Sequence, residues 1–322
     1  MRMAILGAGA IAVKMATTIA GMENVQAYAV AARSLDRAEA FAKTYGFERA
    51  YGSYEEMLQD ENVDLVYVAT PHSHHYKCAV LCLEHGKNVL CEKSFTVNAD
   101  QARKLIALAE EKKLLLTEAI WTRYMPSRRI IDQIIADGEI GEVTSLTANL
   151  GYQLSEIKRI WDPELAGGAL LDVGVYLVNF ARMVFGNNVT DIRSSAVFKN
   201  GVDMIDSITM VFDGDKVATM QSHVKAALNR DGRIFGTKGY IEIQNINNPE
   251  KICVFNEDYE LVKEYPIPEQ ITGYEYEVEA CVRAIENGDL ECPEMPHAET
   301  IAVMEIMDGM RKSWGYEIPL LQ

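Results

Sequence analysis

The sequence predicts an α/β protein in which a parallel sheet, covered by helices on both faces, precedes an α+β domain with an open antiparallel sheet. Short apolar strands alternate with helices over the first 120 residues, the order that builds parallel sheets. Further along, strands follow one another with turn signals between them and without intervening helices. Since single cores usually stop growing near about 250 residues, we expect this chain of 322 residues to form two domains, residues 1–120 and 121–322.

The first domain is predicted from apolar strands and helices that alternate along the chain. We expect strands at Arg2–Leu6, Val25–Ala32, Asp64–Ala69, Asn88–Cys91 and Leu114–Glu118. We expect helices at Ala10–Ala20, Asp36–Tyr45, Ser53–Leu58, Ser73–His85 and Ala99–Lys112. Ser53, with Glu56 three residues later, forms a capping box, a typical beginning of a helix.

The second domain has a different pattern, which starts after Trp121. The predicted helices are Ser127–Ala136, Ala169–Phe185, Tyr274–Glu286 and Ala298–Trp314. The predicted strands are Val143–Tyr152, Ile192–Val197, Ser207–Phe212, Val217–His223, Gly232–Gly236, Tyr240–Gln244, Ile252–Asn256 and Leu261–Ile267. Turn signals such as Asn200-Gly201 separate the later strands, so we expect an open and largely antiparallel sheet.

Composition and charge exclude several classes of protein. The formal net charge of −16 argues against a nucleic-acid partner, because binding to phosphate backbones needs a basic surface. The N-terminus enters a strand directly, unlike a signal peptide, and no apolar run resembles a membrane-spanning helix of about 20 residues. The six cysteines fit reduced, buried thiols and not a small disulfide framework. We therefore expect a cytoplasmic protein that binds neither nucleic acid nor membrane.

A glycine-rich turn follows the first strand. Its residues, Gly7-Ala8-Gly9-Ala10-Ile11-Ala12, match the pattern G-x-G-x-x-A. Gly7 permits a tight turn, Gly9 lets the backbone approach a pyrophosphate, and Ala12 lets the helix pack close to the strand. The helix N-terminus then offers N–H groups and a positive dipole to phosphates. Within a strand–turn–helix unit this pattern predicts a dinucleotide-binding Rossmann domain, with a plain glycine turn as the lesser alternative.

The end of the second strand predicts which dinucleotide binds. Sites for NAD usually place an acidic residue there to bind the ribose 2′-hydroxyl. This chain has Arg33 and Ser34 at that place, while Asp36 lies in the next helix. The guanidinium of Arg33 can pair with a 2′-phosphate, and Ser34 can donate a hydrogen bond to it. We therefore expect NADP(H) as the cofactor and NAD(H) as the weaker ligand, with a solvated surface arginine as the alternative for Arg33.

Further motifs resemble one family of oxidoreductases. One strand ends in Thr70-Pro71-His72-Ser73-His74, the next in Glu92-Lys93-Ser94, and the middle of the chain carries Gly167–Tyr176. With the glycine turn, these motifs resemble the glucose-fructose oxidoreductase / inositol dehydrogenase / rhizopine catabolism (Gfo/Idh/MocA) family over nearly the whole chain. Glu118–Arg123 and the run that ends at Tyr176 most resemble its dimeric dihydrodiol dehydrogenases and NADP-dependent D-xylose dehydrogenases. The resemblance implies a Rossmann domain and an open-faced antiparallel sheet, often used for dimerisation, and hence a homodimer or higher homo-oligomer.

The resemblance also implies hydride transfer between a CH–OH carbon and a nicotinamide, assisted by Lys93 and Tyr176. A tyrosine with a free pKa of about 10 is a poor base at neutral pH, but a nearby ammonium lowers that pKa. Lys93 follows a parallel strand at the edge where such sheets bind ligands. Asp172 lies four residues before Tyr176 on a predicted helix, so both side chains can face one spot. There Asp172 can orient Lys93 or a substrate hydroxyl.

Each of these three residues also has an ordinary structural explanation. A tyrosine on an apolar helix usually belongs to the core, a lysine after a strand to the surface, and an aspartate near a helix start to the helix dipole. Two departures from the family pattern bear on the same residues. The usual Glu-Lys-Pro is Glu-Lys-Ser here, so Ser94 can loosen the loop that carries Lys93. Many members have histidine where this chain has Tyr176.

Other residues expected to border the cofactor lie at or just beyond strand ends: Thr70, Pro71, His74, Glu92, Trp121 and Arg123. The histidines after Pro71, with Cys78, suggest a metal site, but no paired carboxylate completes a zinc shell and the family works without metal, so we expect none. The predicted function is an NADP(H)-dependent oxidoreductase acting on a sugar, an inositol or a cyclic diol. Two alternatives stay open: a non-catalytic NADP(H)-binding sensor, and a redox-neutral, glycosidase-like member with bound NAD.

Overall fold

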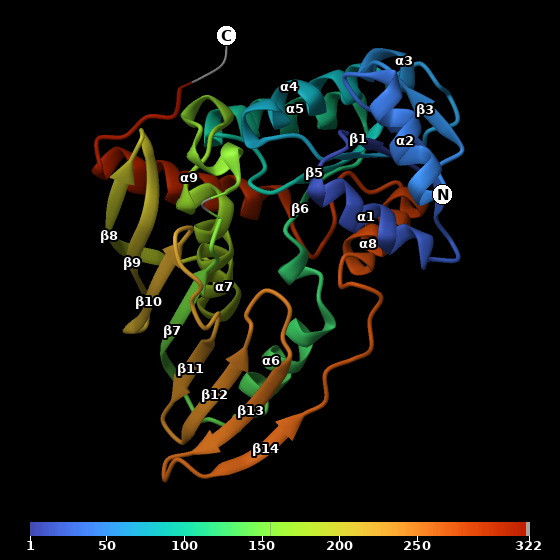
Figure 1. Cartoon of the computed structure of the whole chain (residues 1–322). Coiled ribbons are helices and arrows are strands. Elements are labelled where there is room, and N and C mark those ends of the chain that lie inside the picture. The colour runs from blue at the N-terminus through green and yellow to red at the C-terminus, as the bar shows by residue number, and fades with distance from the viewer. Residues whose placement is uncertain (155, 320–322) are drawn as a thin grey trace. The chain divides into compact units, whose positions relative to one another are not determined.

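The computed structural model describes residues 1–154 and 156–319, which form two compact units (Figure 1). Unit 1 consists of Met1–Tyr124 and Gln270–Met304, and unit 2 consists of Met125–Glu269 and the chain from Glu305 onward. Unit 1 holds a six-stranded parallel sheet, and unit 2 holds an eight-stranded sheet in which most neighbours are antiparallel. The predicted fold class is therefore confirmed.

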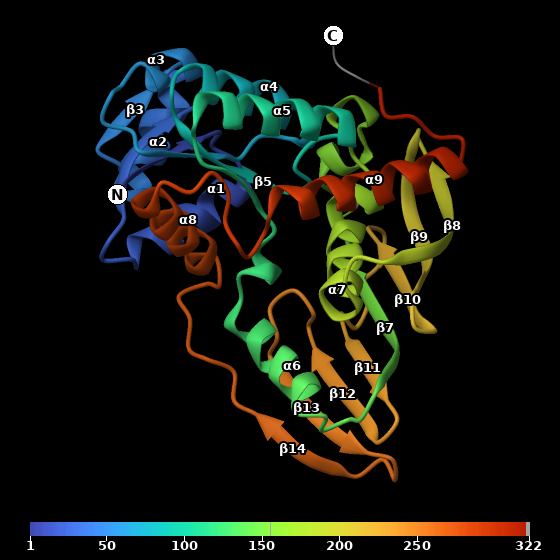
Figure 2. The same ribbon diagram turned by 180° about the vertical axis from the view of Figure 1, so that it is seen from behind.

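The sheet of unit 1 has the strand order β3-β2-β1-β4-β5-β6. Its strands are β1 Arg2–Leu6, β2 Gln26–Ala31, β3 Arg49–Tyr51, β4 Leu65–Val68, β5 Asn88–Glu92 and β6 Leu116–Ala119. The helices are α1 Ala10–Ala20, α2 Leu35–Tyr45, α3 Tyr54–Leu58, α4 His72–Glu84, α5 Ala99–Lys112 and α8 Glu275–Asn287. Helices α4 and α5 lie on one face of the sheet, and α1 and α8 lie on the other (Figures 1 and 2). Because helices cover both faces, central strands such as β4 are buried throughout and consist of continuous apolar residues.

The position of the predicted cofactor motifs follows from this strand order. The strands β1 and β4 are parallel neighbours, and the order of the sheet reverses between them. In open α/β sheets, ligands bind beyond the carboxyl ends of the strands at such a point. The glycine turn follows β1, and the motif Thr70–His74 follows β4. The fold therefore brings these two motifs to the same edge of the sheet.

The last part of unit 1 comes from a late segment of the chain, Gln270–Met304. This segment lies beside the start of β6, where Leu116 N donates a 3.0 Å hydrogen bond to the carbonyl oxygen of Leu290. Helix α9, His297–Ser313, begins in unit 1 and ends in unit 2. The sequence indicated the two helices of this region but gave no sign that the segment packs with the first sheet.

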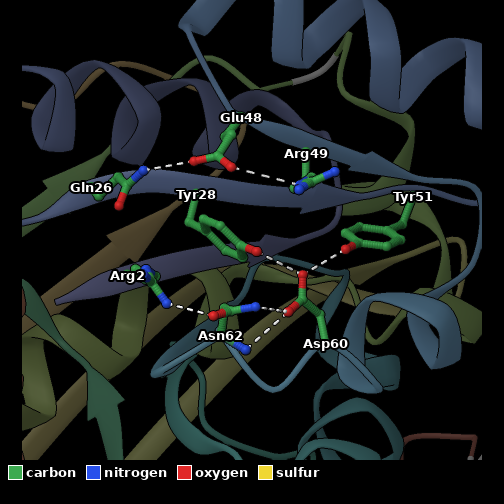
Figure 3. A network of polar contacts seen from close by, with 8 residues as sticks. All are labelled: Arg2, Gln26, Tyr28, Glu48, Arg49, Tyr51, Asp60 and Asn62. Atoms are coloured by element: carbon green, nitrogen blue, oxygen red, sulfur yellow. Dashed lines mark hydrogen bonds and ion pairs between the residues drawn. The ribbon is translucent and has the colours of Figure 1, made fainter.

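A polar network links the outer strands of unit 1 (Figure 3). Asp60, in the turn before β4, accepts hydrogen bonds from the hydroxyls of Tyr28 on β2 (2.8 Å) and Tyr51 on β3 (2.7 Å). The backbone N–H and side-chain amide of Asn62 donate to its other oxygen. Burial alone would raise the pKa of Asp60, but these hydrogen bonds outweigh burial and hold the pKa well below its usual range. The ionised carboxylate therefore stabilises this side of the sheet.

The sheet of unit 2 has the order β14-β13-β12-β11-β7-β10-β9-β8. Its strands are β7 Val143–Gly151, β8 Val189–Lys199, β9 Val202–Phe212, β10 Lys216–His223, β11 Gly232–Gly236, β12 Gly239–Gln244, β13 Lys251–Asn256 and β14 Leu261–Tyr265. Neighbouring strands are antiparallel except for β7 and β10, which are parallel. Helices α6 Pro126–Ala136 and α7 Val175–Phe185 lie against one face of this sheet (Figure 2). Strands such as β12 alternate buried and half-buried residues, as expected of a sheet with one packed face.

One stretch of unit 2, Pro163–Phe185, is long and apolar enough to cross a membrane by length and composition. The sequence-based expectation that no run of this kind exists is therefore wrong. The most apolar window of this stretch is 89% buried inside the structure, which is typical of a core helix in a folded domain.

Candidate active site

The turn from β1 into α1 has the conformation that its glycines permit. Gly7 has a φ of +107°, and a Cβ there would lie 2.9 Å from the carbonyl oxygen of Ala69. Gly9 is extended and faces open space, since a Cβ built on it meets nothing within 4 Å. No side chain in the described part of the chain caps the start of α1, and Ala12 is fully buried, so α1 packs close to the strands. Uncapped N–H groups at a helix start fit the phosphates of a dinucleotide.

Two arginines, Arg33 and Arg37, follow β2, the first just beyond the strand and the second on the first turn of α2. Arg33 is exposed, and Ser34 precedes α2 without a side-chain cap. Arg37, on the first turn of α2, donates a 3.3 Å hydrogen bond to the carbonyl oxygen of Ala8 in the glycine turn. Both arginines act on Tyr54, whose pKa is raised by burial and lowered by the two guanidinium charges. Arg33 and Arg37 therefore share one region beside the glycine turn. The sequence analysis missed Arg37, whose only signal is its spacing of four residues from Arg33.

His74 adjoins the same cationic region. It lies on the first turn of α4, after Thr70 and Pro71, and its Nδ1 is 2.9 Å from the hydroxyl oxygen of Ser73. Burial lowers the pKa of His74, and the charges of Arg33 and a nearby lysine lower it further. These effects favour the neutral imidazole of His74, and its contact with the cofactor stays a prediction.

His75 fixes the loop that carries Lys93. Its ring is fully buried, with Nδ1 2.8 Å from the carbonyl oxygen of Ser94 and Nε2 2.8 Å from that of Thr70. Each ring nitrogen therefore lies within hydrogen-bond distance of a backbone carbonyl oxygen, and His75 ties the Lys93 loop to the end of β4. Lys93 is half-buried, and its peptide bond to Ser94 is cis. The sequence analysis considered His75 only as a metal ligand. No group of three or more His, Cys, Asp or Glu side chains within the described ranges is placed to hold a metal ion.

Two buried carboxyl groups hold the backbone around Lys93. Glu92, the last residue of β5, accepts hydrogen bonds from the Tyr67 hydroxyl and, at 3.1 Å, from Lys93 N. Glu118, on β6, accepts a 3.1 Å hydrogen bond from Phe95 N. Burial raises the pKa of Glu118 to about 7, although the hydrogen bond from Phe95 opposes this shift. Glu92 therefore helps to hold the backbone before Lys93, and its contact with the cofactor stays a prediction.

Trp121 and Arg123 lie on a short 3-10 helix, Trp121–Arg123, after β6. The rings of Trp121 and Tyr274 stack with their centroids 4.2 Å apart and an interplanar angle of 20°. Arg123 forms a 2.5 Å ion pair with Glu299, and both side chains are largely buried. Both partners come from the segment that returns to unit 1. Contact of Trp121 or Arg123 with a cofactor stays a prediction.

The predicted helix with Asp172 and Tyr176 begins with a π-helical turn, Leu170–Gly174, and continues as α7. Wide turns of this kind often occur at functional sites. Asp172 and Tyr176 are 7% and 9% exposed, and Asp172 Oδ1 accepts a 2.9 Å hydrogen bond from Arg159 Nη1. These residues belong to unit 2 and Lys93 belongs to unit 1, so the pairing of Lys93 with Tyr176 stays a prediction.

Asp203, on β9, anchors the start of this helical run. Its Oδ2 accepts a 2.6 Å hydrogen bond from Leu170 N. Gly168 has a φ of +113°, and a Cβ there would lie 2.2 Å from Asp203 Oδ1, so glycine is required for the approach. Burial and the charge of Asp203 raise the pKa of the neighbouring Asp206 well above its usual range, so the pair keeps a proton. No motif in the sequence indicated either aspartate.

Comparison with known families agrees with these motifs. The N-terminal residues 1–120 match the model described as oxidoreductase family, NAD-binding Rossmann fold. Residues 129–242 match the GFO/IDH/MocA C-terminal domain. The two matches together cover most of the chain.

Individual relatives extend over almost the whole length. Trans-1,2-dihydrobenzene-1,2-diol dehydrogenase from Mus musculus is 34% identical over 331 residues, which cover 99% of this chain and 98% of the relative. Among solved structures, the 3-ketoreductase KijD10 from Actinomadura kijaniata with NADP and TDP-benzene has a TM-score of 0.89 at 23% identity and 97% coverage of both chains. Levoglucosan dehydrogenase with NADH has a TM-score of 0.86 at 18% identity and full coverage of both chains. The two structures share the fold. The chain belongs to the Gfo/Idh/MocA oxidoreductase family and is an NAD(P)-dependent dehydrogenase or reductase that acts on CH–OH groups.

Proposed function

We propose that the protein interconverts an alcohol and a carbonyl on a sugar, an inositol or a related cyclic diol, with NADP(H) as its cofactor. The observation that carries the proposal is the position of Lys93 at the carboxyl end of β5. Glu92 and His75 hold its loop from within unit 1, and the glycine turn occupies the same edge of the sheet. Relatives named for dihydrodiols, levoglucosan and a 3-keto group all imply oxidation or reduction at a single oxygen-bearing carbon.

The choice of NADP(H) rests on charge at the end of β2. A carboxylate there would bind a ribose 2′-hydroxyl and repel a 2′-phosphate. The run Ala31–Ser34 has no acidic residue, and Arg33 and Arg37 supply two guanidinium groups near the glycine turn. Guanidinium groups bind phosphates through paired, charge-assisted hydrogen bonds. Because the solved neighbours were bound to NADP in one case and NADH in another, the residues of this chain decide the preference.

The proposed chemistry assigns one proton to Tyr176. A nicotinamide cofactor held at the glycine turn and the end of β2 would supply the hydride chemistry at the carbinol carbon. Tyr176, as a phenolate, takes the proton of the reacting hydroxyl, and it returns that proton to the oxygen when a carbonyl is reduced. The Lys93 ammonium stabilises the phenolate and donates a hydrogen bond to the same substrate oxygen. Asp172, paired with Arg159, orients a neighbouring substrate hydroxyl.

The direct test is reduction of NADP⁺ by the full-length protein with a panel of aldoses, inositols and cyclic trans-dihydrodiols. We expect formation of NADPH with at least one class of substrate, and weaker turnover with NAD⁺. Binding of NADP(H) without turnover of any member of the panel would favour the non-catalytic sensor. A firmly retained NAD with no net redox reaction would favour the glycosidase-like alternative.

We also propose a homodimer that forms through the sheet of unit 2. Its edge strands β8 and β14 expose large apolar side chains: Val197, Phe198, Leu261 and Val262 are between 39% and 61% exposed. Open strand edges with apolar residues are liable to pair with other chains unless a partner covers them. A second copy of the chain is the simplest such partner, since most oligomers are symmetric.

A further inference from the structure

The loop after β5 is bound at Phe95 by side chains from two neighbouring strands. Cys91, on β5, and Glu118, on β6, are partners in the register of the parallel sheet. Cys91 Sγ donates a 3.7 Å hydrogen bond to the carbonyl oxygen of Phe95, and Glu118 Oε1 accepts a 3.1 Å hydrogen bond from Phe95 N. Both peptide groups of Phe95, two residues beyond Lys93, are therefore bound by side chains. We refer to Cys91, Glu118 and the backbone of Phe95 as the Phe95 clamp.

The Phe95 clamp acts on a buried loop. Residues 93–98 connect β5 to α5 and belong to neither element. Ser94 and Phe95 are at most 1% exposed, so water does not reach their peptide groups. Side chains bind these groups instead, as His75 does at the carbonyl oxygen of Ser94. The position of Lys93, at the start of this loop, therefore depends on a few side-chain contacts.

Glu118 lies in surroundings that oppose its negative charge. The residue is 1% exposed, and its Oε2 has no hydrogen-bond partner among the residues that the structure describes. Arg123 offers a positive charge, but it is itself paired with Glu299 at 2.5 Å. The charge of Glu92, on the neighbouring strand, repels a second carboxylate. An ionised Glu118 therefore costs free energy that an ionised surface glutamate does not.

These surroundings bring the titration of Glu118 close to neutral pH. Burial raises the pKa of its carboxyl to about 7, although hydrogen bonds from Phe95 N and the Thr300 hydroxyl oppose this shift. The thiol of Cys91 stays neutral, because burial raises its pKa well above the usual range. A carboxylate accepts an N–H about twice as strongly as a neutral group does. Phe95 is therefore bound more weakly by the protonated carboxyl than by the carboxylate.

We propose that Glu118 is a positioning residue for Lys93 and that the loss of its proton tightens the Phe95 clamp. A looser clamp lets the loop open more often, and Lys93 then leaves the place from which it acts on the substrate oxygen and on Tyr176. This consequence for turnover rests on the proposed function, whereas the tightening of the loop does not. Turnover is thereby coupled to pH by a fully buried carboxyl, in addition to the titration of Tyr176.

The experiment measures hydrogen–deuterium exchange at residues 94–97 of the full-length protein at about pH 6 and about pH 8, on either side of the pKa of Glu118. Each rate is divided by the intrinsic rate at that pH, and helix α5 is the reference for global opening. Glu118→Gln keeps an acceptor of the same size but stays neutral, and Glu118→Met removes the acceptor. Glu277→Met is the matched control, because Glu277 is equally buried in unit 1 and neither of its oxygens has a hydrogen-bond partner within the described part of the chain.

At about pH 8, we expect wild type to protect residues 94–97 about threefold to thirtyfold more strongly than Glu118→Gln does, the difference between a charged and a neutral hydrogen bond. At about pH 6 the two proteins should agree within about twofold, because both then offer a neutral acceptor. Glu118→Met should lose protection about tenfold or more at both pH values. Glu277→Met should leave the exchange of residues 94–97 unchanged relative to α5.

Turnover is measured with NADP⁺ and D-xylose, myo-inositol or trans-1,2-dihydrobenzene-1,2-diol. Glu118→Met should lower kcat about tenfold, with NADP(H) affinity within about threefold of wild type. The ratio of kcat between wild type and Glu118→Gln should rise from about pH 6 to about pH 8, since the titration of Tyr176 is common to both proteins and cancels in the ratio.

The inference is overturned if wild type and Glu118→Gln exchange equally at both pH values, or if Glu277→Met loosens residues 94–97 as much as Glu118→Met does. Altered exchange with unchanged kcat would overturn the role of Glu118 in positioning Lys93 and leave the proposed function standing. If wild type turns over none of the three substrates, the proposed function is contradicted, and the exchange rates alone decide whether the proton of Glu118 controls the clamp.

Discussion

Replacing Asp203 by asparagine tests whether a buried carboxylate holds the helix of Asp172 and Tyr176. The carboxylate accepts the N–H of Leu170 at 2.6 Å and lies at the positive end of the helical run. A hydrogen bond to a charged group contributes about 1.5–3 kcal/mol and a partly buried charge at a helix end up to about 2 kcal/mol. Asparagine keeps one neutral acceptor, worth about 1 kcal/mol. We therefore expect the free energy of unfolding to fall by roughly 2–3 kcal/mol.

The assay is urea unfolding at pH 7, followed by circular dichroism, with kcat and NADP(H) affinity measured alongside. Turnover should fall, because Tyr176 lies six residues beyond the anchored Leu170 on the same helical run, while cofactor affinity should stay constant because the Rossmann domain lies in unit 1. Asp206→Asn is the matched control: burial and the charge of Asp203 raise the pKa of Asp206, which favours its neutral form, so a neutral amide should cost less than about 1 kcal/mol. A fully stable Asp203→Asn protein, or an Asp206→Asn protein damaged to the same extent, would refute the reasoning.

Five other substitutions and one measurement of mass test the remaining predictions. Arg33→Ala and Arg37→Ala should each weaken NADP(H) binding about tenfold to a hundredfold, the loss of a charge-assisted phosphate contact, as measured by fluorescence titration. Tyr176→Phe should lower kcat by about 10²–10⁴. Lys93→Met should also move the acidic limb of the kcat/KM profile for alcohol oxidation to higher pH, since no ammonium then lowers the pKa of the phenol that must ionise. Asp60→Asn should lower the free energy of unfolding by roughly 1–2 kcal/mol at neutral pH. The pKa of Asp60 is lower in the folded protein than in the unfolded chain. The difference in stability is therefore fully present above the unfolded pKa of about 4 and shrinks as the pH falls below it. Light scattering at micromolar concentration should give twice the chain mass of 36.0 kDa.

Each of these expectations has a contrary result. Unchanged NADP(H) affinity in both arginine variants would make Arg33 and Arg37 surface residues. Wild-type turnover in Tyr176→Phe would make the tyrosine part of the core. A stability difference for Asp60→Asn that does not depend on pH would show that the ionised carboxylate of Asp60 does not stabilise the sheet. A mass of 36.0 kDa in light scattering would contradict the dimer.

The sequence predicted those helices and turns that depend on a few neighbouring residues. Helix α5 was predicted with its observed bounds, and the Asn98 side chain that precedes it accepts a hydrogen bond from Gln101 N. Ser53 likewise accepts from Glu56 N at the start of α3, as its capping pattern indicated. Gly7 has the positive φ that the glycine turn requires. In each case one or two neighbouring residues determine the structure, so the pattern is readable without knowledge of the fold.

The elements that were missed depend on distant parts of the chain. The strand β3, Arg49–Tyr51, has three residues, too few to show an alternating pattern, and it forms because β2 lies beside it. The π-helical turn at Leu170–Gly174 uses the same apolar residues as an α-helix, and no periodicity separates the two. The parallel pairing of β7 with β10 is set by the order of strands in the sheet, which turn residues do not encode.

The sequence named residues of the candidate site, but it did not indicate the contacts that these residues make. Lys93, Tyr176 and the glycine turn belong to motifs, so their positions could be named in advance. His75 and Asp203 act on backbone carbonyl and N–H groups, which every residue has, so no motif marks them. Arg37 also bonds to a backbone carbonyl oxygen. Glu92 belongs to a motif that was recognised, but the motif did not indicate its hydrogen bonds with Tyr67 and the backbone of Lys93.

The return of Gln270–Met304 to unit 1 has a consequence for the order of folding. Chains fold as they emerge from the ribosome, N-terminal segments first. At the time residue 124 has emerged, Leu116 N still lacks the carbonyl oxygen of Leu290, and Trp121 still lacks the ring of Tyr274. All eight strands of unit 2, by contrast, lie between Val143 and Tyr265 and emerge before that segment. The sheet of the half that begins second is therefore complete first, and a newly made chain acquires its complete nucleotide-binding half only near the end of translation.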